Sequence, residues 1–235
     1  LSYRVPERHP SVNAAELQYI QSDDKLSEDA GTVSWRQALQ KKQTWGFAIA
    51  KFLTDPVWWF FLYWLPPYLY DVRKFNLIEI GWALPVVYLM ADAGSVGGGW
   101  ISGFLMRRGW PNGKARKTAM AVCASAMPVA VLSVLADSPI LAIGLVSLAT
   151  AGHQGWSANL FTTTSDIFPQ RAVASVTGIG GFAGGLGGIL ISAIIPGYMV
   201  SHFGYTPVFL SMGLFHLTAL LVVHKTMGDM RQIEV

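Results

Sequence analysis

Ionisable side chains that interrupt long apolar stretches are the residues of this sequence best suited to chemistry. Lys51 and Asp55 are four positions apart, so on a helix they share one face and can form an ion pair. Asp92 lies inside a second apolar stretch. A charged group within a membrane-spanning helix is costly and by default marks the path of a substrate or an ion. Two other interpretations stay open: Lys51 could extend to the membrane surface, and Asp92 could join helices through hydrogen bonds.

A second polar group lies farther along the chain. Its members are His153, Gln154, Trp156 and Asn159. On a helix, Trp156 and Asn159 are one turn apart and Gln154 lies near the same face. Amide groups can bind hydroxyls and an indole face can cover the C–H surface of a sugar ring, so this stripe suits a hydroxylated ligand. Hydrogen bonding between helices in lipid is the alternative role.

Three ionisable residues are candidates for a path of substrate or coupling ion, namely Asp55, Asp92 and His153. A single histidine within a helix is more often structural than a proton relay, so His153 has no further assigned role. No metal site and no cofactor are expected. The lone cysteine, Cys123, lies inside an apolar stretch, which favours packing over chemistry.

The elements that must position these residues are membrane helices. Between Lys117 and Asp166 the only Asp, Glu, Lys or Arg is Asp137, and none occurs from Ala172 to His224. About 20 apolar residues allow a helix to cross a hydrocarbon core roughly 30 Å thick. Charged residues make up 13% of the chain, about half of the share in a soluble domain. The sequence therefore predicts an all-α membrane protein.

The apolar stretches divide the chain into three regions. A bundle of six transmembrane helices is expected over residues 44–224, preceded by a polar segment over 1–43 and followed by a tail over 225–235. The expected helices cover about 44–70, 82–106, 118–136, 140–162, 172–200 and 208–224. Pro56 is expected to kink the first helix, because it cannot donate to the helix ladder.

The first 43 residues are expected to form short helices beside the membrane. Asn13, followed three residues later by Glu16, resembles a capping box and predicts a helix over 13–21. Residues 22–31 are polar and acidic, as in a linker. Residues 35–42 combine Trp35 with basic side chains, which suits a helix on a membrane surface. A solvated tether is the alternative for this segment.

Basic residues are distributed unequally between the two sides that six alternating helices would create. One side collects Arg4, Arg8, Lys25, Arg36, Lys41, Lys42, Arg107, Arg108, Lys114, Arg116, Lys117, Arg171, Lys225 and Arg231. The other side collects only Arg73 and Lys74. Because cytoplasmic loops are enriched in Lys and Arg, both termini are expected in the cytoplasm. Since these basic residues lie in loops between apolar helices, the net charge of +3 does not indicate a nucleic-acid partner.

The glycine-rich stretch over 178–188 is expected to be a packing surface. Residues 178–183 match a dinucleotide-binding pattern, but that pattern requires a preceding strand and a soluble βαβ unit. Gly180, Gly184 and Gly188 instead share one face of the predicted helix and would allow a neighbouring backbone to approach closely. Pro196 and Gly197 are expected to leave this helix bendable.

Several motifs together resemble a transporter family. Gly99-Trp-Ile-Ser-Gly103 ahead of Arg107-Arg-Gly109 is similar to the major facilitator signature, with Gly103 where that signature usually has Asp. The remaining motifs resemble bacterial hexuronate carriers of the anion:cation symporter family. They are Lys51-Phe-Leu-Thr-Asp55-Pro56-x-Trp58-Trp59, Ala91-Asp92-Ala-Gly-Ser95, His153-Gln-Gly-Trp156-Ser-Ala-Asn159, Ser165-Asp166-x-Phe-Pro169, Gly178-Ile-Gly-Gly181 and, in the polar segment, Pro6-Glu-x-His9-Pro10.

The resemblance implies the C-terminal half of a twelve-helix major facilitator fold in a bacterial inner membrane. Such carriers work by alternating access, with substrate near the bilayer midplane between two halves. It further implies proton-driven import of a sugar acid such as glucuronate or galacturonate, with a missing N-terminal half that carries the proton-coupling residues. The substrate contacts are then expected to include Lys51, Gln154, Trp156 and Asn159.

Other functions are weighed against this one. The substrate could be another organic anion, an aldonate or an aldarate, or the chain could be a truncated half-carrier with no transport activity alone. An intramembrane serine protease would need a Gly-x-Ser-Gly motif, but Trp100 and Ile101 precede Ser102, so that motif fails. The protein is not expected to be an enzyme.

Overall fold

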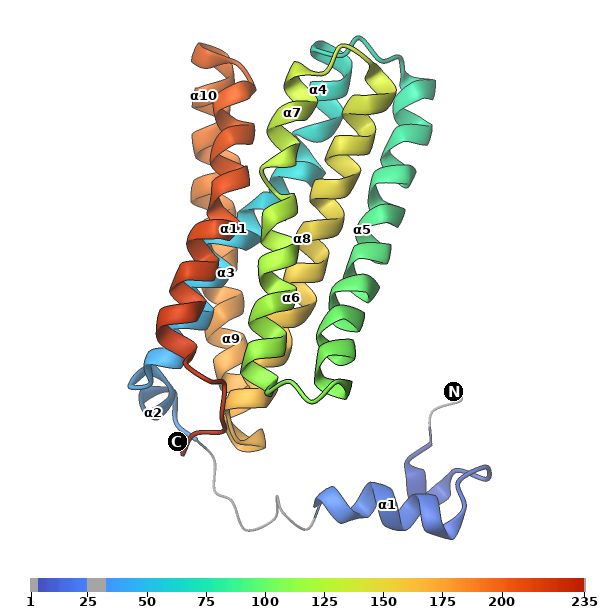
Figure 1. The fold of residues 1–235 in the computed structure, drawn as a ribbon, viewed down its shortest axis with the longest axis vertical. Coiled ribbons are helices and arrows are strands. Elements are labelled where there is room, and N and C mark those ends of the chain that lie inside the picture. Colours follow the sequence, from blue (N-terminus) through green and yellow to red (C-terminus); the bar gives the residue numbers. More distant parts are fainter. Residues whose placement is uncertain (1–3, 25–32, 235) are drawn as a thin grey trace.

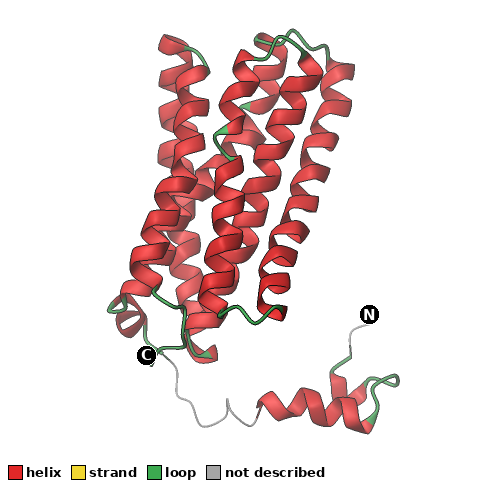
Figure 2. Cartoon of the chain, in the orientation of Figure 1, coloured by secondary structure: helices red, strands yellow, loops and turns green. Residues whose placement is uncertain are grey.

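The computed structural model describes residues 4–24 and 33–234 of the chain. Within these ranges the chain forms helices and no strand (Figure 2). The polar segment holds the short helices η1 (Pro6–Arg8), α1 (Ala14–Asp24) and α2 (Trp35–Leu39). As predicted, Asn13 caps α1, because its Oδ1 accepts a hydrogen bond from the Glu16 amide at 2.9 Å. Most of the predicted linker over 22–31 lies outside the described residues.

The remaining helices form a bundle in which six long helical paths run side by side (Figure 1). Their elements are α3 (Lys42–Tyr63) with α4 (Leu65–Asp71), α5 (Leu77–Arg107), α6 (Asn112–Ala126) with α7 (Val129–Leu135), α8 (Pro139–Ile167), α9 (Gln170–Gly187) with a π-helix (Gly188–Ile194) and α10 (Ile195–Phe203), and α11 (Thr206–Met227). Each predicted helix of the bundle is therefore present, with shifted ends or interruptions.

Four of the six paths are long and apolar enough, by length and composition, to cross a membrane: 77–107, 112–135, 170–203 and 206–227. Helices α3 and α8 are long enough but not among these four. They are also the two helices that carry the polar residues singled out above, Lys51 and Asp55 on α3 and the group around His153 on α8.

Prolines and caps explain where the helices differ from the predicted ranges. Helix α3 continues through Pro56, and the interruption comes at Trp64, directly before Leu65, Pro66 and Pro67. Pro128 similarly separates α6 from α7, because proline cannot donate to the preceding turn. Helix α5 begins at Leu77, five residues earlier than predicted.

The early start of α5 has a local cause that the sequence contains. Asn76 accepts hydrogen bonds from the amides of Ile78 and Glu79, and Glu79 accepts one in return from the Asn76 amide. This reciprocal arrangement is a capping box. It satisfies amide groups that the first turn of a helix leaves unpaired.

The glycine face predicted over Gly180, Gly184 and Gly188 is confirmed, with Gly188 at the start of the π-helix, where an added Cβ atom would lie 2.9 Å from the Trp59 ring. A Cβ atom added to Gly180 would lie 2.1 Å from the Phe47 ring, and one added to Gly184 would lie 2.1 Å from Asp55 Oδ2. At Gly187 the obstacle is the backbone oxygen of Phe52, at 2.3 Å. Helix α9 therefore packs closely against α3, and at Gly187, where the obstacle is backbone, a larger residue would force the two helices to shift.

A second close contact joins α5 to α8. A Cβ atom at Gly98 would lie 2.4 Å from the Cα atom of Gly155, and Gly94 is equally confined by the Ala151 backbone. At one end of the bundle Arg116 adds a polar tie, since its Nε lies 2.9 Å from Asp166 Oδ2 and its guanidinium donates to Ser102 Oγ at 3.0 Å. Gly103 stands where the family signature usually has Asp, but Arg116 of α6 still links α8 through Asp166 and α5 through Ser102.

Candidate functional site

The Lys51–Asp55 pair predicted from sequence spacing is formed. Lys51 Nζ lies 2.7 Å from Asp55 Oδ2, and the two side chains are only 7% and 21% exposed. A buried ammonium without a counter-ion would strongly destabilise the fold. The Asp55 carboxylate supplies that counter-ion and so stabilises Lys51 inside the bundle. The ammonium does not reach the surface, in contrast to the alternative in which Lys51 extends there.

Two other helices hold this pair in place. The Lys51 ammonium lies 3.9 Å from the centre of the Phe161 ring on α8, a distance at which a cation is attracted to an aromatic face. On the other side, Gly184 of α9 leaves the space that the Asp55 carboxylate occupies. The pair therefore lies where α3, α8 and α9 meet, and a carboxylate ligand could compete with Asp55 for the same ammonium.

His153 of α8 belongs to a second buried cluster, which is aromatic and contacts α3 at Trp58. Its ring stacks on Trp58 of α3, with ring centres 5.7 Å apart and planes 7° apart. Its Nδ1 atom lies 3.0 Å from Nε2 of His216 on α11. Both histidines are at least 97% buried. The contact between His216 and His153 could not be predicted, because the two residues are far apart in the chain.

Trp156 and Asn159 lie on the buried side of α8, and both are fully buried. The Trp156 ring meets His216 edge to face at 5.5 Å. Asn159 donates to the backbone oxygens of Gly98 and Gly155, both at 2.9 Å, and thereby bridges α5 and α8. For Asn159 this geometry matches the alternative in which the amide joins helices.

The two other predicted residues lie nearer the surface of the bundle. Gln154 is half-buried. Asp92 is exposed on α5 and makes no ion pair with any residue that the structure describes. Its helix neighbours Leu89 and Val96 are 67% and 75% exposed, so Asp92 lies on an apolar face. The structure thus groups Lys51 with Asp55 and His153 with Trp156, and it leaves Asp92 apart from both groups.

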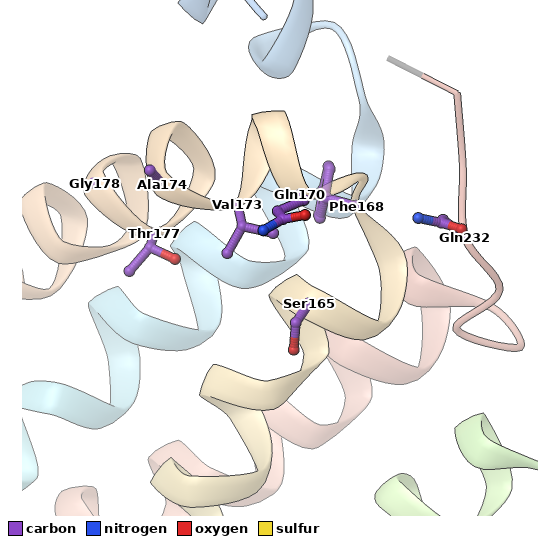
Figure 3. A pocket seen from close by; sticks show the side chains of 8 residues that line it. All are labelled: Ser165, Phe168, Gln170, Val173, Ala174, Thr177, Gly178 and Gln232. Carbon is purple, nitrogen blue, oxygen red and sulfur yellow. The ribbon is translucent and has the colours of Figure 1, made fainter. Parts of the chain in front are cut away.

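A pocket within the described part of the chain is separate from these groups (Figure 3). It has a volume of about 840 Å³ and lies where α8 ends, α9 begins and the C-terminal segment passes. Its lining has no charged side chain and consists of Ser165, Phe168, Gln170, Val173, Ala174, Thr177, Gly178 and Gln232. Without a cation it offers little to an anionic ligand.

Sequence reasoning missed the residues that complete the two groups. Phe161, Trp58 and His216 each touch a predicted site residue from another helix. Trp58 could have been found, because it is three residues after Asp55 and seven after Lys51 and so shares their helix face. Phe161 and His216 had no such signal.

Comparison with known proteins places the chain in a family. The model of the Major Facilitator Superfamily matches residues 1–192, which is well over half of the chain. The chain belongs to the Major Facilitator Superfamily. Its members are membrane transporters, which agrees with the helical bundle and with its exposed apolar helices.

Curated relatives within the superfamily carry names of sugar-acid transporters. A hexuronate transporter of Escherichia coli (strain K12) is 29% identical over 239 residues, covering 99% of this chain and 55% of that protein. A D-galactonate transporter of Escherichia coli O6:H1 is 26% identical, covering 98% and 56%. A protein of Bacillus subtilis named "Probable galactarate/D-glucarate transporter" is 28% identical, covering 97% and 52%. The chain spans about half the length of these relatives.

Proposed function

We propose that this chain is the second half of a proton-coupled carrier that moves a sugar acid across a bacterial inner membrane by alternating access. The names of the relatives support the substrate class, and the share of their length that the chain covers supports a two-half carrier. The partner is then an N-terminal half of six helices. Together the two halves would enclose a central site near the bilayer midplane.

The observation that carries the proposal is the buried Lys51 ammonium. It is held by Asp55 at 2.7 Å and by the Phe161 ring at 3.9 Å, inside a bundle whose surface is apolar. A hexuronate brings one carboxylate, and Lys51 is the buried cation of α3 that can receive it. Burial strengthens such a contact beyond the roughly 0–1 kcal/mol of an exposed ion pair.

The other site residues take distinct roles in the proposal. Gln154 is half-buried, so its amide can reach a hydroxyl of the substrate. Trp156 and Asn159 are fully buried, so they contact substrate only in a conformation in which α8 moves away from its neighbours. Asp55 and Asp92 are assigned to the path of substrate or coupling ion, Asp55 because a ligand carboxylate would replace it at Lys51.

We place both termini in the cytoplasm. In Figure 1 the α5–α6 connection, the α8–α9 turn, α2 and the C-terminus share one end of the bundle. The connections at that end hold most of the basic loop residues, whereas the α4–α5 connection, which holds Arg73 and Lys74, lies at the other end (Figure 1). In this arrangement residues 1–43 and 225–235 are cytoplasmic and residues 44–224 form the membrane domain with six spans.

Two alternatives have support of their own. Relatives named for galactonate and for galactarate or glucarate favour an aldonate or aldarate as the substrate. The chain could also be a truncated half without transport activity alone, because the central site would lie between two halves.

The proposal is tested by comparing the affinities of two ligands, one with a carboxylate and one without. Calorimetry on the full-length carrier, meaning this chain with the N-terminal half that the proposal requires, would measure glucuronate against glucose. A hydrogen bond to a charged group contributes about 1.5–3 kcal/mol, so glucuronate is expected to bind roughly ten- to a hundredfold more tightly. Equal affinity for the two would contradict the proposal, and tighter binding of galactonate or glucarate would shift it to those acids.

A further inference from the structure

A hydrogen-bonded histidine pair is buried between α8 and α11. His153 Nδ1 and His216 Nε2 are 3.0 Å apart, so one ring nitrogen donates and the other accepts. The His216 ring is completely buried, and its Nδ1 atom faces the Met212 backbone without a well-formed hydrogen bond. Buried polar atoms are nearly always paired, so this incompletely satisfied nitrogen calls for an explanation.

Aromatic side chains enclose the pair rather than polar partners. Trp58 of α3 stacks on His153, and Trp156 meets the edge of His216. Tyr88 of α5 touches the far side of Trp58, at 5.9 Å between ring centres.

The charges that face the pair come from α3. Lys51, Asp55 and Trp58 share one helix face, and Trp58 is the residue stacked on His153. Lys51 is seven residues before Trp58, roughly 10 Å along the helix. On the other packed helices, Tyr88 of α5 contacts Trp58, and Cys123 of α6 has its sulfur beside Gly155. Neither adds a charge at neutral pH.

The net charge of this region changes when an anion arrives. Lys51 and Asp55 together are neutral, and burial with a nearby ammonium disfavours a charged imidazole. A ligand carboxylate at Lys51 adds one negative charge, and an imidazolium would restore neutrality. Two unit charges about 10 Å apart, at an effective dielectric near 20, change each other's binding roughly 10- to 20-fold.

We propose that His153 and His216 form a proton-binding site that takes up one proton when an anion binds at Lys51. This inference rests on the proposed function, and it assigns to this half a part in proton coupling that the family resemblance places in the other half. The proton comes from water and makes one ring an imidazolium, which donates to its neutral partner. The linkage is reciprocal, so a proton on the pair tightens anion binding by the same factor.

Calorimetry of the full-length carrier tests the proposal. Glucuronate is titrated at several pH values between roughly 4 and 6.5, each in two buffers with different ionisation enthalpies, and the difference in heat gives the protons taken up per anion. Because the buried pair is neutral in the free carrier, the parent is expected to take up a fraction of one proton that grows as the pH is lowered. His153→Gln and His216→Gln are expected to keep glucuronate binding within about 10- to 20-fold of the parent, since they lose only the linkage, and to lose the uptake. The exposed His202→Gln and His224→Gln serve as matched controls and should leave it unchanged.

Each outcome decides between the two proposals. Glucuronate binding without proton uptake in the parent, or uptake that persists in both variants of the pair, would overturn the histidine site and leave the carrier function standing. No glucuronate binding in the parent would instead contradict the proposed function. If the variants do not fold, the ring ¹⁵N resonances of the parent decide: imidazolium shifts on addition of glucuronate support the site, and neutral rings throughout overturn it.

Discussion

At the scale of single residues, the molecule depends on how a buried cation is balanced. Lys51 pairs with Asp55 and lies against the Phe161 ring. The ion pair could be predicted because a spacing of four residues places both side chains on one helix face. The aromatic neighbour could not, because the packing of α3 against α8 depends on side chains of the whole bundle. The same limit applies to the His153–His216 contact.

The Asp55→Asn variant distinguishes the contribution of Asp55 to stability from its effect on ligand binding at Lys51. Asp55→Asn is expected to destabilise the bundle by about 1–3 kcal/mol, because Lys51 loses its charged partner. It is expected to leave glucuronate affinity unchanged or higher, because the ammonium is freed for the ligand. Thermal unfolding and calorimetry measure the two effects, with the exposed Asp92→Asn as the control for stability. A large loss of affinity would instead identify Asp55 as a ligand contact.

At the scale of the elements, prolines and caps determine where helices stop and glycines determine how closely they pack. The predicted ranges missed the interruptions before Pro66 and at Pro128 and the capping box at Asn76, although the prolines and the Asn–Glu spacing are present in the sequence. The glycine face of α9 followed from helical spacing, but its partner did not. Phe47, Phe52 and Asp55 of α3 are the residues that face it, and only the fold brings α3 and α9 together.

Two neighbouring glycines of α9 make a matched test of this packing. A Cβ atom at Gly187 would lie 2.3 Å from the backbone oxygen of Phe52, whereas one at Gly185 would meet nothing within 4 Å. Gly187→Ala is therefore expected to destabilise the protein by about 1–3 kcal/mol, the usual cost of overpacking. Gly185→Ala is expected to be neutral or slightly stabilising, since alanine favours a helix over glycine. Thermal unfolding in detergent distinguishes them, and equal stability of the two variants would contradict the close α3–α9 contact.

At the scale of the whole molecule, the apolar surface and the charged ends define how the bundle meets its surroundings. Large apolar side chains are exposed on several helices, for example Leu77 at 80%, Val96 at 75% and Phe182 at 73%. Soluble monomers rarely expose broad apolar surfaces, so lipid or a partner domain must cover these. The sequence predicted this from its apolar stretches, although α3 and α8 are too polar to be recognised by composition alone.

The orientation of the bundle is open to cysteine labelling of intact cells. With Cys123 replaced by alanine, single cysteines are introduced at Lys74, Gly204 or Asn112. The cysteines at 74 and 204 are expected to react with a membrane-impermeant reagent from outside, and the cysteine at 112 is not, because the basic end of the bundle is placed in the cytoplasm. The reverse pattern would show that both termini face outward.

The proposed site lies between two halves, so this chain alone should not transport. Vesicles that contain only residues 1–235 are expected to take up labelled glucuronate no faster than empty vesicles. Vesicles with the full-length carrier provide the positive control. Uptake by the chain alone above the level of empty vesicles would show that one half contains a complete pathway.

The central claim is that the buried Lys51 ammonium binds the carboxylate of the substrate. It is tested most directly by titrating glucuronate into the full-length carrier and its Lys51→Gln variant, with Lys225→Gln as a control at an exposed lysine. Loss of a hydrogen bond to a charged group costs about 1.5–3 kcal/mol, so Lys51→Gln should bind roughly ten- to a hundredfold more weakly while folding and inserting normally. Unchanged affinity in a folded Lys51→Gln protein would contradict the claim and reduce Lys51 to a structural partner of Asp55.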